Sequence, residues 1–410
     1  MIKKIAALGL SLALMTGLTS CYSTHELDFE DVVQSTQSKL ATASILSDEE
    51  LYERAKEEVK ENKIMIYSST SITEDVVENF EKAYPELSEK VHFRDLDDEN
   101  EYGELITSME ENTDEVDVLI SHSDLVKVLA EKGEVYGYYP ISKKDVVGDE
   151  YGKPMPFMFS SSVFMYDSSR GKISLDNVWE LTEAEYKGKI LMKDPRNEQV
   201  NMEFFYMLSS PTWTQKLKDA YKEYYGTEWK PGAYNKISAE WTYKFIDNCV
   251  FPEEYSSADI IKALLEDDEQ KIALVGYSKF RKLDEEQQSR ISVFGLEDDV
   301  EGFSGFAFGT YATVAHDTPC PYTCALFINY ILSEEGFSGE GAWNNYPGYY
   351  STNQTIEKSL ANDENFDYWK QRLIVEDTSY IKDQNDRMKS YIEKCIERAH
   401  RKADRDFGEE

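Results

Sequence analysis

The sequence lacks the short motifs by which many enzymes are identified. Its 410 residues contain no Gly-x-Ser-x-Gly, no His-Glu-x-x-His and no P-loop. The carboxylates form no distinctive pair, and the five histidines are scattered along the chain. We therefore expect a protein that is not an enzyme and needs no cofactor, with a hydrolase as the least favoured alternative.

Cysteine pairs with metal-binding or redox spacing are also missing. Beyond Cys21 the chain has four cysteines and no Cys-x-x-Cys, and no histidine lies nearby at ligand spacing. A zinc site is therefore not expected. Cys320 and Cys324 either close a small disulfide in an oxidising compartment or are free thiols, partly buried. The sequence does not choose a pairing among Cys249, Cys320, Cys324 and Cys395.

Positive charge is scarce. The chain has 44 Lys and Arg against 79 Asp and Glu, which gives a formal net charge of −35. Such a chain repels nucleic acid and anionic lipid headgroups at long range, so no nucleic-acid partner is expected. The surplus of acid mainly favours solubility, and a local pocket can still have the opposite sign.

Long apolar runs are absent as well, and the run at residues 5–14 is too short to span a bilayer. It follows Lys3 and Lys4, and a Leu-Thr-Ser-Cys string ends at Cys21. This pattern resembles the lipobox of bacterial lipoproteins. The resemblance implies a signal peptide at residues 1–20, lipidation of Cys21 and an extracytoplasmic chain anchored to the bacterial membrane. The alternative is an ordinary secretory signal with a chance cysteine.

The next segment, residues 21–46, is rich in Ser, Thr, Gln and Asp and lacks a sustained period. This composition predicts a flexible tether. Ser47 then has the position of a helix N-cap, with Glu50 at the capping-box position.

Strand and helix patterns alternate over the following hundred residues. Strands are expected at residues 63–70, 91–96 and 116–120, and helices at 72–83, 101–111 and from 125 onward. This alternation predicts a parallel sheet covered on both faces.

Polar residues follow two of these strands: Ser68, Ser69 and Thr70 after the first, Ser121 and His122 after the third. Ligands of open α/β sheets bind outside the carboxyl ends of the strands, near helix N-termini that favour anionic groups. We therefore predict that these five residues contact a ligand. The alternative is that they only cap the helices.

The region from residue 154 onward changes character. Residues 157–166 predict a long strand with a polar centre that includes Ser161, and it could pass between two domains. Later strands are expected at 189–193, 271–276, 290–294 and 306–314, a helix at 322–335, and several amphipathic helices beyond 355.

Five strings, taken in order, resemble extracellular solute-binding proteins of the iron(III)-binding type, which serve ATP-driven importers. They lie at residues 51–58 with 64–69, 117–119, 179–181 with 186–190 and 194–195, 271–277, and 325–336. The resemblance implies an α/β, two-lobed type II periplasmic-binding-protein fold with two crossover hinge strands.

The lobes implied by this resemblance are residues 60–160 plus 305–350 and residues 165–300, with C-terminal helices at 351–410 packing on them. The implied function is capture of a small polar solute in the interlobe cleft by hinge closure, followed by delivery to an ABC permease. A surface sensor or adhesin on the same fold is the alternative.

The resemblance is incomplete at the residues that bind iron in this family. Iron-binding members place two adjacent tyrosines after the strand that matches residues 272–276, whereas this chain has Tyr277 followed by Ser278. Iron is therefore less favoured than the sugar phosphates, phosphonates, polyamines or thiamine that related members bind. Tyr277, Trp343 and Tyr346 are candidates for stacking on a sugar or covering a cation.

An arginine and its polar neighbour complete the candidate site. Arg196 and Asn197 follow an Asp-Pro dipeptide at an expected helix start, where an arginine suits an anionic group. The alternative is a solvated arginine at the beginning of a helix.

Overall fold

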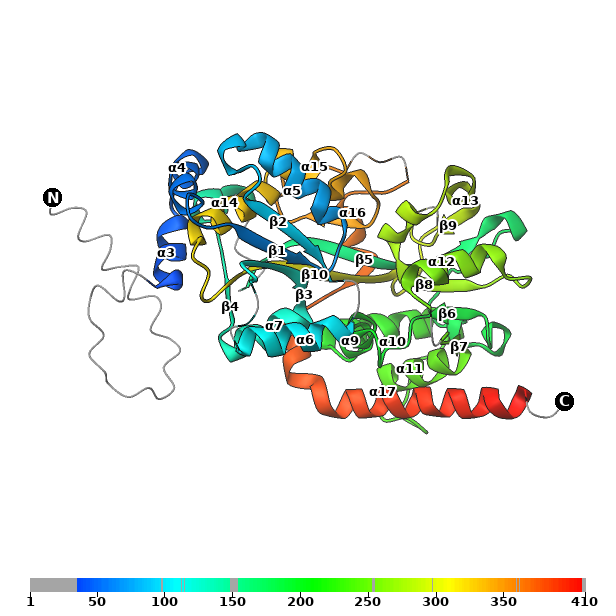
Figure 1. The fold of residues 1–410 in the computed structure, drawn as a ribbon. Helices are drawn as coiled ribbons and strands as arrows, with labels where there is room; N and C mark the ends of the chain where they lie inside the picture. Colours follow the sequence, from blue (N-terminus) through cyan, green and yellow to red (C-terminus); the bar gives the residue numbers. More distant parts are fainter. Residues whose placement is uncertain are drawn as a thin grey trace, which may run out of the picture.

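The computed structural model describes residues 35–96, 99–111, 113, 115–147, 154–252, 255–296, 298–358, 360 and 362–407 (Figure 1). The expected signal peptide at 1–20, Cys21 and most of the expected tether lie outside the described residues.

A single twelve-stranded mixed sheet organises the described chain. Its strands follow the order β2-β1-β3-β10-β5-β8-β6-β7, with β4 and β12 also paired to β10 and β9 and β11 to β5. The strands are β1 Ile64–Ser68, β2 Val91–Asp95, β3 Val118–His122, β4 Val135–Gly137, β5 Pro156–Asp167, β6 Ile190–Met192, β7 Cys249–Val250, β8 Ile272–Gly276, β9 Ile291–Val293, β10 Gly305–Ala315, β11 Tyr349–Ser351 and β12 Leu373–Val375.

Helices cover this sheet on both faces (Figure 1). They are α3 Thr36–Ala43, α4 Asp48–Glu58, α5 Ile72–Ala83, α6 Glu99–Glu110, α7 Ser123–Lys132, α8 Lys144–Val147, α9 Gln199–Leu208, α10 Pro211–Tyr225, α11 Ile237–Asn248, α12 Ser257–Glu266, α13 Glu285–Arg290, α14 Pro321–Ile331, α15 Glu334–Ser338, α16 Phe366–Trp369 and α17 Thr378–Phe407. A 3-10 helix, η6 Tyr277–Lys282, follows β8 directly.

Two long buried strands, β5 and β10, join the halves of the molecule. They pair antiparallel from Gly305 opposite Val163 to Tyr311 opposite Pro156. Beyond this stretch β10 pairs with β3 and β4, whereas β5 pairs with β8 and β9. We call β1–β4, α3–α8, α14 and α15 the first half, and β6–β9, α9–α13 and α17 the second half.

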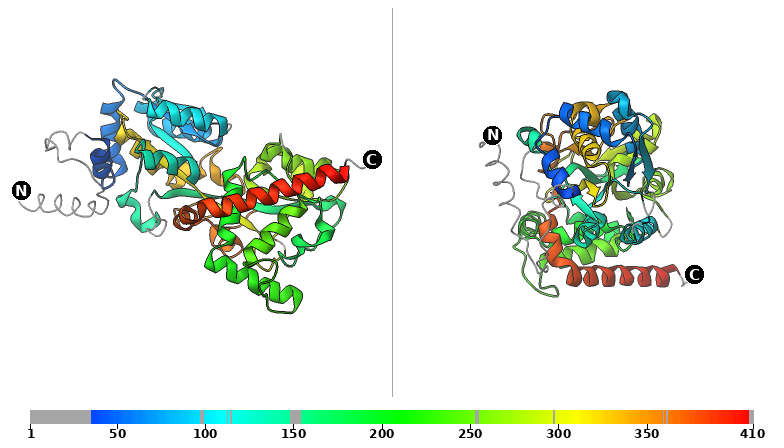
Figure 2. Two further views of the ribbon diagram at one scale, coloured as in Figure 1. Left: turned by 90° about the horizontal axis from the view of Figure 1, so that it is seen from below. Right: turned by 60° about the vertical axis from the view of Figure 1, so that its left-hand side comes forward.

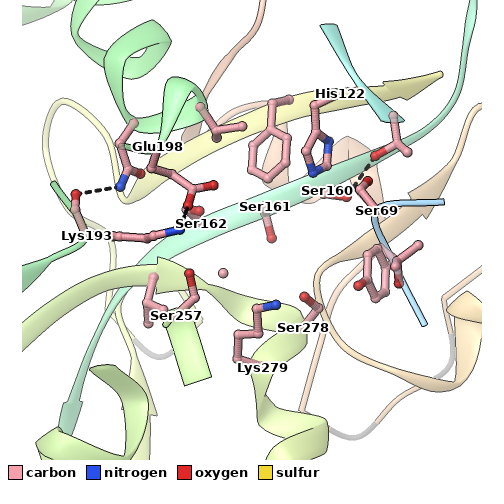
Figure 3. Close-up of a pocket in the computed structure, with 18 of the residues that line it drawn as sticks. Ser69, His122, Ser160, Ser161, Ser162, Lys193, Glu198, Ser257, Ser278 and Lys279 are labelled. Atoms are coloured by element: carbon pink, nitrogen blue, oxygen red, sulfur yellow. Dashed lines mark hydrogen bonds and ion pairs between the residues drawn. The ribbon is translucent and has the colours of Figure 1, made fainter. Parts of the chain in front are cut away.

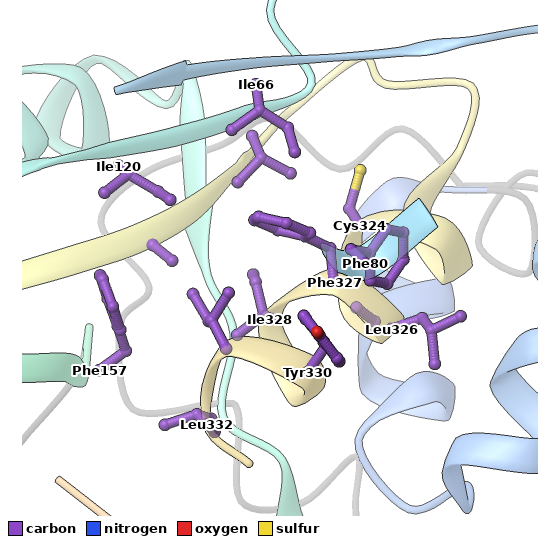
Figure 4. Packing of buried hydrophobic residues seen from close by; sticks show 14 of the residues in the cluster. Ile66, Phe80, Ile120, Phe157, Cys324, Leu326, Phe327, Ile328, Tyr330 and Leu332 are labelled. Carbon is purple, nitrogen blue, oxygen red and sulfur yellow. The ribbon is translucent and has the colours of Figure 1, made fainter. Parts of the chain in front are cut away.

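Each half has its own hydrophobic core. In the first half α14 packs on α4 and the sheet, and Phe80 meets Phe327 edge-on at 5.3 Å between ring centroids (Figure 4). In the second half Trp241 stacks on Phe245 at 4.5 Å, within a cluster that continues through Phe204. The two cores therefore lie on either side of the paired strands β5 and β10.

Most expected elements of residues 47–335 are confirmed. Ser47 and Glu50 form a capping box at the start of α4. The three early strands pair in parallel as β2-β1-β3, with α5, α6 and α7 following them in turn. The long expected strand is β5, and every residue of it is buried.

Two expectations about the ends of the chain are wrong. The tether was expected to extend to residue 46, but α3 is a helix that packs on α14, with Leu40 and Ala43 buried. Its apolar residues are too few to show a period in the sequence, yet two of them suffice for a short helix to join the core. Beyond residue 355 the chain forms β12 as well as helices, and α17 runs along the second half against α9 and α11 (Figure 2).

The cysteines are free thiols throughout the described part of the chain. Cys320 and Cys324 are buried at the start of α14, Cys395 is buried in α17, and Cys249 is partly buried. Burial raises the pKa of the Cys320 thiol to about 12. Among the described helices, none combines the length and apolar composition that a membrane crossing requires.

Candidate functional site

A cavity of about 110 Å³ lies where β5 and β10 cross, at the carboxyl ends of β1, β3, β6 and β8 (Figure 3). Both halves of the molecule contribute to its wall. The polar lining residues are Ser69, Thr70, His122, Ser160, Ser161, Ser162, Lys193, Glu198, Asn201, Ser257, Ser278, Lys279, Arg281, Thr310 and Tyr349.

Hydroxyl groups form most of this polar wall. Those of Ser69 and Thr70 are buried and have no hydrogen-bond partner among the described residues. A buried hydroxyl without a partner costs about 1–3 kcal/mol, so these groups are suited to a polar ligand that satisfies them. Ser160 and Thr310, by contrast, bond each other at 3.2 Å.

Lys279 supplies an unpaired cation to the cavity. Its side chain extends from η6 toward the strand that carries Ser161 and Ser162 (Figure 3). No described residue forms a hydrogen bond or an ion pair with the ammonium group. Burial lowers the pKa of Lys279, and the nearby Arg281 lowers it further. A partly buried charge without a protein partner is costly, and an anionic ligand would reduce that cost.

The other charged groups of the cavity already have partners. Lys193 forms an ion pair with Glu198 at 2.5 Å, and Asn201 fixes the same loop by donating to the Lys193 carbonyl at 2.9 Å. Arg281 donates to the Ser278 carbonyl at 3.2 Å and to the Tyr349 hydroxyl at 3.4 Å. Three cations against one carboxylate make this wall positive within a strongly acidic chain.

His122 lies at the end of β3, where its ring meets Phe308 edge-on at 5.1 Å. Its Nδ1 is buried without a hydrogen-bond partner. Burial lowers the pKa of His122, while the carboxylate of Asp124 raises it. The ring is therefore an uncharged polar group at the cavity wall around neutral pH.

A glycine, Gly348, packs behind the cavity residues Ser161 and Ser278. Gly348 has φ +80° and accepts a hydrogen bond from the Ser161 N–H at 3.0 Å. A Cβ there would lie 2.7 Å from the Cβ of Tyr277 and 3.0 Å from the Ser278 nitrogen. Only glycine allows this close approach of the loop to η6 without strain.

Four of the nine predicted ligand residues line the cavity: Ser69, Thr70, His122 and Ser161. Three of them follow β1 or β3, as the rule for open α/β sheets predicts. The fourth lies in the polar centre of β5. Their contact with a ligand stays a prediction.

Five predicted residues are not part of the cavity wall. The Ser68 hydroxyl contacts Thr73 at 2.7 Å and accepts from the Thr70 N–H, so it serves the turn between β1 and α5. Ser121 is buried in β3. Tyr277 is buried and donates its hydroxyl proton to the Asn362 carbonyl.

Arg196 and Asn197 also lie elsewhere. Arg196 bonds the Asp194 carboxylate through its Nε at 3.0 Å and contacts His400, and Asn197 is exposed. Of the aromatic candidates, Trp343 is buried against Phe157. Tyr346 lies on a second, more open cavity of about 230 Å³, together with Ser71, Ile72, Asp75, Arg281 and Lys282.

Four charged residues of the cavity were not predicted from the sequence: Lys193, Glu198, Lys279 and Arg281. A signal for them existed, because each follows β6 or β8 closely, and the rule that selected Ser69 applies equally there. The described residues contain no group of three or more His, Cys, Asp or Glu side chains arranged to hold a metal ion.

The comparisons with known proteins bear on the fold. No protein-family model matches the sequence, and no curated protein matches it. Solved structures do match. The apo ferric ion-binding protein A of Pasteurella haemolytica aligns over 83% of this chain and 98% of its own, with a TM-score of 0.57 and 15% identity.

Two further structures agree with it. An ABC transporter protein of Clostridium perfringens covers 83% of this chain and 99% of its own, at 15% identity and a TM-score of 0.53. The periplasmic binding protein AfuA of Actinobacillus pleuropneumoniae, with exogenous fructose-6-phosphate bound, covers 83% and 98%, at 14% identity and a TM-score of 0.52. The chain therefore has the α/β, two-lobed type II periplasmic-binding-protein fold, and the predicted resemblance is confirmed at the level of the fold.

Proposed function

We propose that the protein is a lipid-anchored extracytoplasmic solute-binding protein of an ATP-driven importer. It captures a small, anionic, hydroxyl-rich solute between its two halves and delivers it to a permease. The fold supports the class of protein, since matching structures include binding proteins of transporters. The lipobox-like string at Cys21 supports the anchor.

The choice of an anionic solute rests on the ammonium group of Lys279, which has no partner among the described residues. It faces a wall of hydroxyl groups, two of which, on Ser69 and Thr70, are buried without partners. A phosphorylated sugar or a phosphonate offers oxygen acceptors to the ammonium and to the hydroxyl groups together. Polyamines and thiamine bring positive charge toward three cations, and Coulomb repulsion disfavours them.

Iron(III) is disfavoured by the same charges. The cavity offers a single phenol, that of Tyr349, while Tyr277 is buried outside it. Hard oxygen ligands suit iron(III), but the remaining carboxylate, that of Glu198, is already paired with Lys193.

Hinge closure is the proposed mechanism. The solute would bind groups from both halves, such as Ser69 on one side and Lys279 on the other. It would stabilise the closed form by its differential affinity for that form, with β5 and β10 as the hinge.

A thermal-shift screen tests the proposal. Phosphorylated sugars and phosphonates are expected to raise the melting temperature, since a ligand at 100 times its Kd stabilises by about 2.7 kcal/mol. Spermidine, thiamine and iron(III) citrate are expected to leave it unchanged. A shift with these compounds alone would contradict the choice of solute, and a conversion product would point to an enzyme.

The anchor is tested separately. The wild-type chain is expected in the membrane fraction of a bacterial host and the Cys21→Ser variant outside it, with the solute-induced shift preserved. Membrane association that survives the substitution would contradict lipidation.

A further inference from the structure

A second buried polar region lies beside His122, apart from the residues that line the cavity. It consists of Ser123 and Asp124 at the start of α7, Glu203 in α9 and Glu376 just after β12. We call these four residues the acid cluster. The proposed capture of solute uses none of them.

The acid cluster connects the two halves. The Ser123 hydroxyl of the first half donates to the Glu203 carboxylate of the second half, at 3.2 Å to Oε2 and 3.4 Å to Oε1. Glu376 accepts a hydrogen bond from the Gly309 N–H at 2.6 Å, and its own N–H donates to the Ala307 carbonyl at 2.8 Å.

Gly309 lies in β10 where that strand stops pairing with β12 and goes on to β3. The acid cluster is thus placed at the hinge. A change of charge in the cluster acts directly on the contact between α7 and α9 and on the strand that links the halves.

The three carboxyl groups lack compensating charge. None of them forms an ion pair with any residue that the structure describes. Oδ1 of Asp124 and Oε1 of Glu376 are buried without a hydrogen-bond partner. The titratable groups that face the cluster are His122 from β3, Glu198 from the loop before α9, Tyr311 from β10 and Asp377 from the loop before α17.

Carboxyl groups in such surroundings retain protons. Burial raises the pKa of all three carboxyl groups above the ordinary range, that of Glu376 to about 7, and the charges of Glu376 and Asp124 raise that of Glu203 further. Like charges packed together in a low-dielectric site cannot all be ionised. A protonated carboxyl group can also donate a hydrogen bond, which the ionised group cannot.

We propose that the acid cluster is a proton-binding joint that holds the two halves in the arrangement seen here and releases them as the pH rises. The inference rests on the proposed function, because it assigns a proton-dependent control to capture of the solute. Protonated, the cluster lets α7 and α9 meet through Ser123 and Glu203. Ionised, it places negative charges together at the hinge, and repulsion separates the halves.

The pH window follows from the direction of the shifts. The folded arrangement binds more protons than the separated or unfolded one wherever the folded pKa is the higher. Its stability is therefore greatest below the ordinary pKa of a carboxyl group and falls as the pH rises toward about 7, the pKa of Glu376. Solute affinity is expected to fall over the same range.

Small-angle X-ray scattering of the full-length chain without solute tests the joint. The wild-type radius of gyration is expected to increase between pH 5 and pH 8. In the Glu203→Gln/Glu376→Gln variant, which leaves Asp124 as the one carboxyl group of the cluster that can ionise, it is expected to stay close to the low-pH value. Glu364→Gln, an exposed glutamate of the same C-terminal segment, is the matched control and is expected to follow the wild type.

Two results would overturn the joint: a wild-type radius that is independent of pH, or a double variant that expands as the wild type does. If the double variant does not fold, the radius of gyration of the wild type as a function of pH is the test by itself. A chain that expands with pH but binds none of the screened solutes would support the joint and contradict the proposed function.

Discussion

Two lysines near Tyr349 of β11, Lys358 and Lys279, have very different surroundings. Lys358 is 3% exposed and donates to the carbonyls of Asn344, Tyr346 and Tyr349, with the carboxylate of Asp363 3.9 Å away. Lys279 lies at the cavity to which Tyr349 contributes its side chain, with no hydrogen bond or ion pair to any residue in the described ranges.

This difference in contacts indicates that the charge of Lys358 stabilises the fold, whereas the charge of Lys279 serves ligand binding. Burial lowers the pKa of both lysines, that of Lys358 to about 8. The contacts of Lys358 offset its desolvation and tie the loop over residues 344–363 to the sheet. Lys279 has no such compensation from the described residues, as is typical of a site that a ligand completes. Replacing each lysine should therefore change different properties.

The largest effect is expected for Lys358→Met. The substitution leaves three carbonyls without their donor and Asp363 without its cation, so the free energy of unfolding should fall by about 3–5 kcal/mol. Urea denaturation measures this loss. Solute affinity of the folded fraction is expected to change little, and an unchanged stability would show that the contacts of Lys358 are not structural.

The next effect is expected for Lys279→Met, and it concerns binding. Solute affinity should fall about 100-fold, or about 2.8 kcal/mol, because the variant loses a cavity cation that has no hydrogen bond or ion pair to any described residue. The free energy of unfolding should rise by about 1 kcal/mol, since a partly buried charge without a protein partner is removed. Isothermal titration and urea denaturation measure the two quantities.

The exposed Lys282, in the same 3-10 helix, is the matched control for Lys279. Lys282→Met should alter affinity less than threefold, through long-range charge alone. If Lys279→Met lost as much stability as Lys358→Met, the conclusion that only Lys358 stabilises the fold would be contradicted.

A smaller effect is expected for Gly348→Ala, which acts on both regions. The Gly348 N–H donates to Asp363 at 2.8 Å, on the side of Lys358. The added Cβ would meet Tyr277 and Ser278 on the side of Lys279. We expect a loss of about 2 kcal/mol in stability, from positive φ and from the close contact.

Gly133→Ala provides the comparison, because Gly133 has φ +85° with nothing near the position of its Cβ. That variant should lose about 1 kcal/mol, from backbone strain alone. Equal losses of stability in the two variants would mean that the loop at Gly348 shifts to accommodate the added Cβ without a further loss of free energy.

The smallest effect is expected for Tyr349→Phe. It removes the acceptor that positions Arg281, and solute affinity should fall two- to fivefold. Tyr346→Phe, on the second cavity, should have no effect on affinity. A titration of the solute found in the screen measures both, and a stronger loss for Tyr346→Phe would move the site toward the second cavity.

Sequence patterns predicted the sheet well where elements are long and regular. The alternation over residues 63–129 is sufficient for β1, β2 and β3 with their helices, because each strand is followed by a helix with a clear apolar face. Short elements gave no such signal. Strand β12 has three residues and exists because it pairs with β10, a partner some 70 residues away in the chain.

For the candidate site, the sequence predicted which segments come close to the cavity, but not the direction in which each side chain points. Ser69, Thr70, His122 and Ser161 line the cavity, whereas Tyr277 and Arg196 belong to correct loops but turn away from it. Tyr277 turns into the core because its ring packs on Phe280 and Trp369. Arg196 turns to Asp194 because a carboxylate two residues away is its nearest partner.

By itself, the sequence determined the alternation of strands and helices, the polar ends of two strands and the string at Cys21, since each depends only on neighbouring residues. Tertiary structure alone decided that Lys279 is unpaired, that Lys358 is satisfied, and that Asp124, Glu203 and Glu376 meet at the hinge. The burial of a polar group and its hydrogen-bond or ion-pair partners depend on residues distant in the chain. Burial and partners together determine whether the group is charged and how much free energy its burial costs.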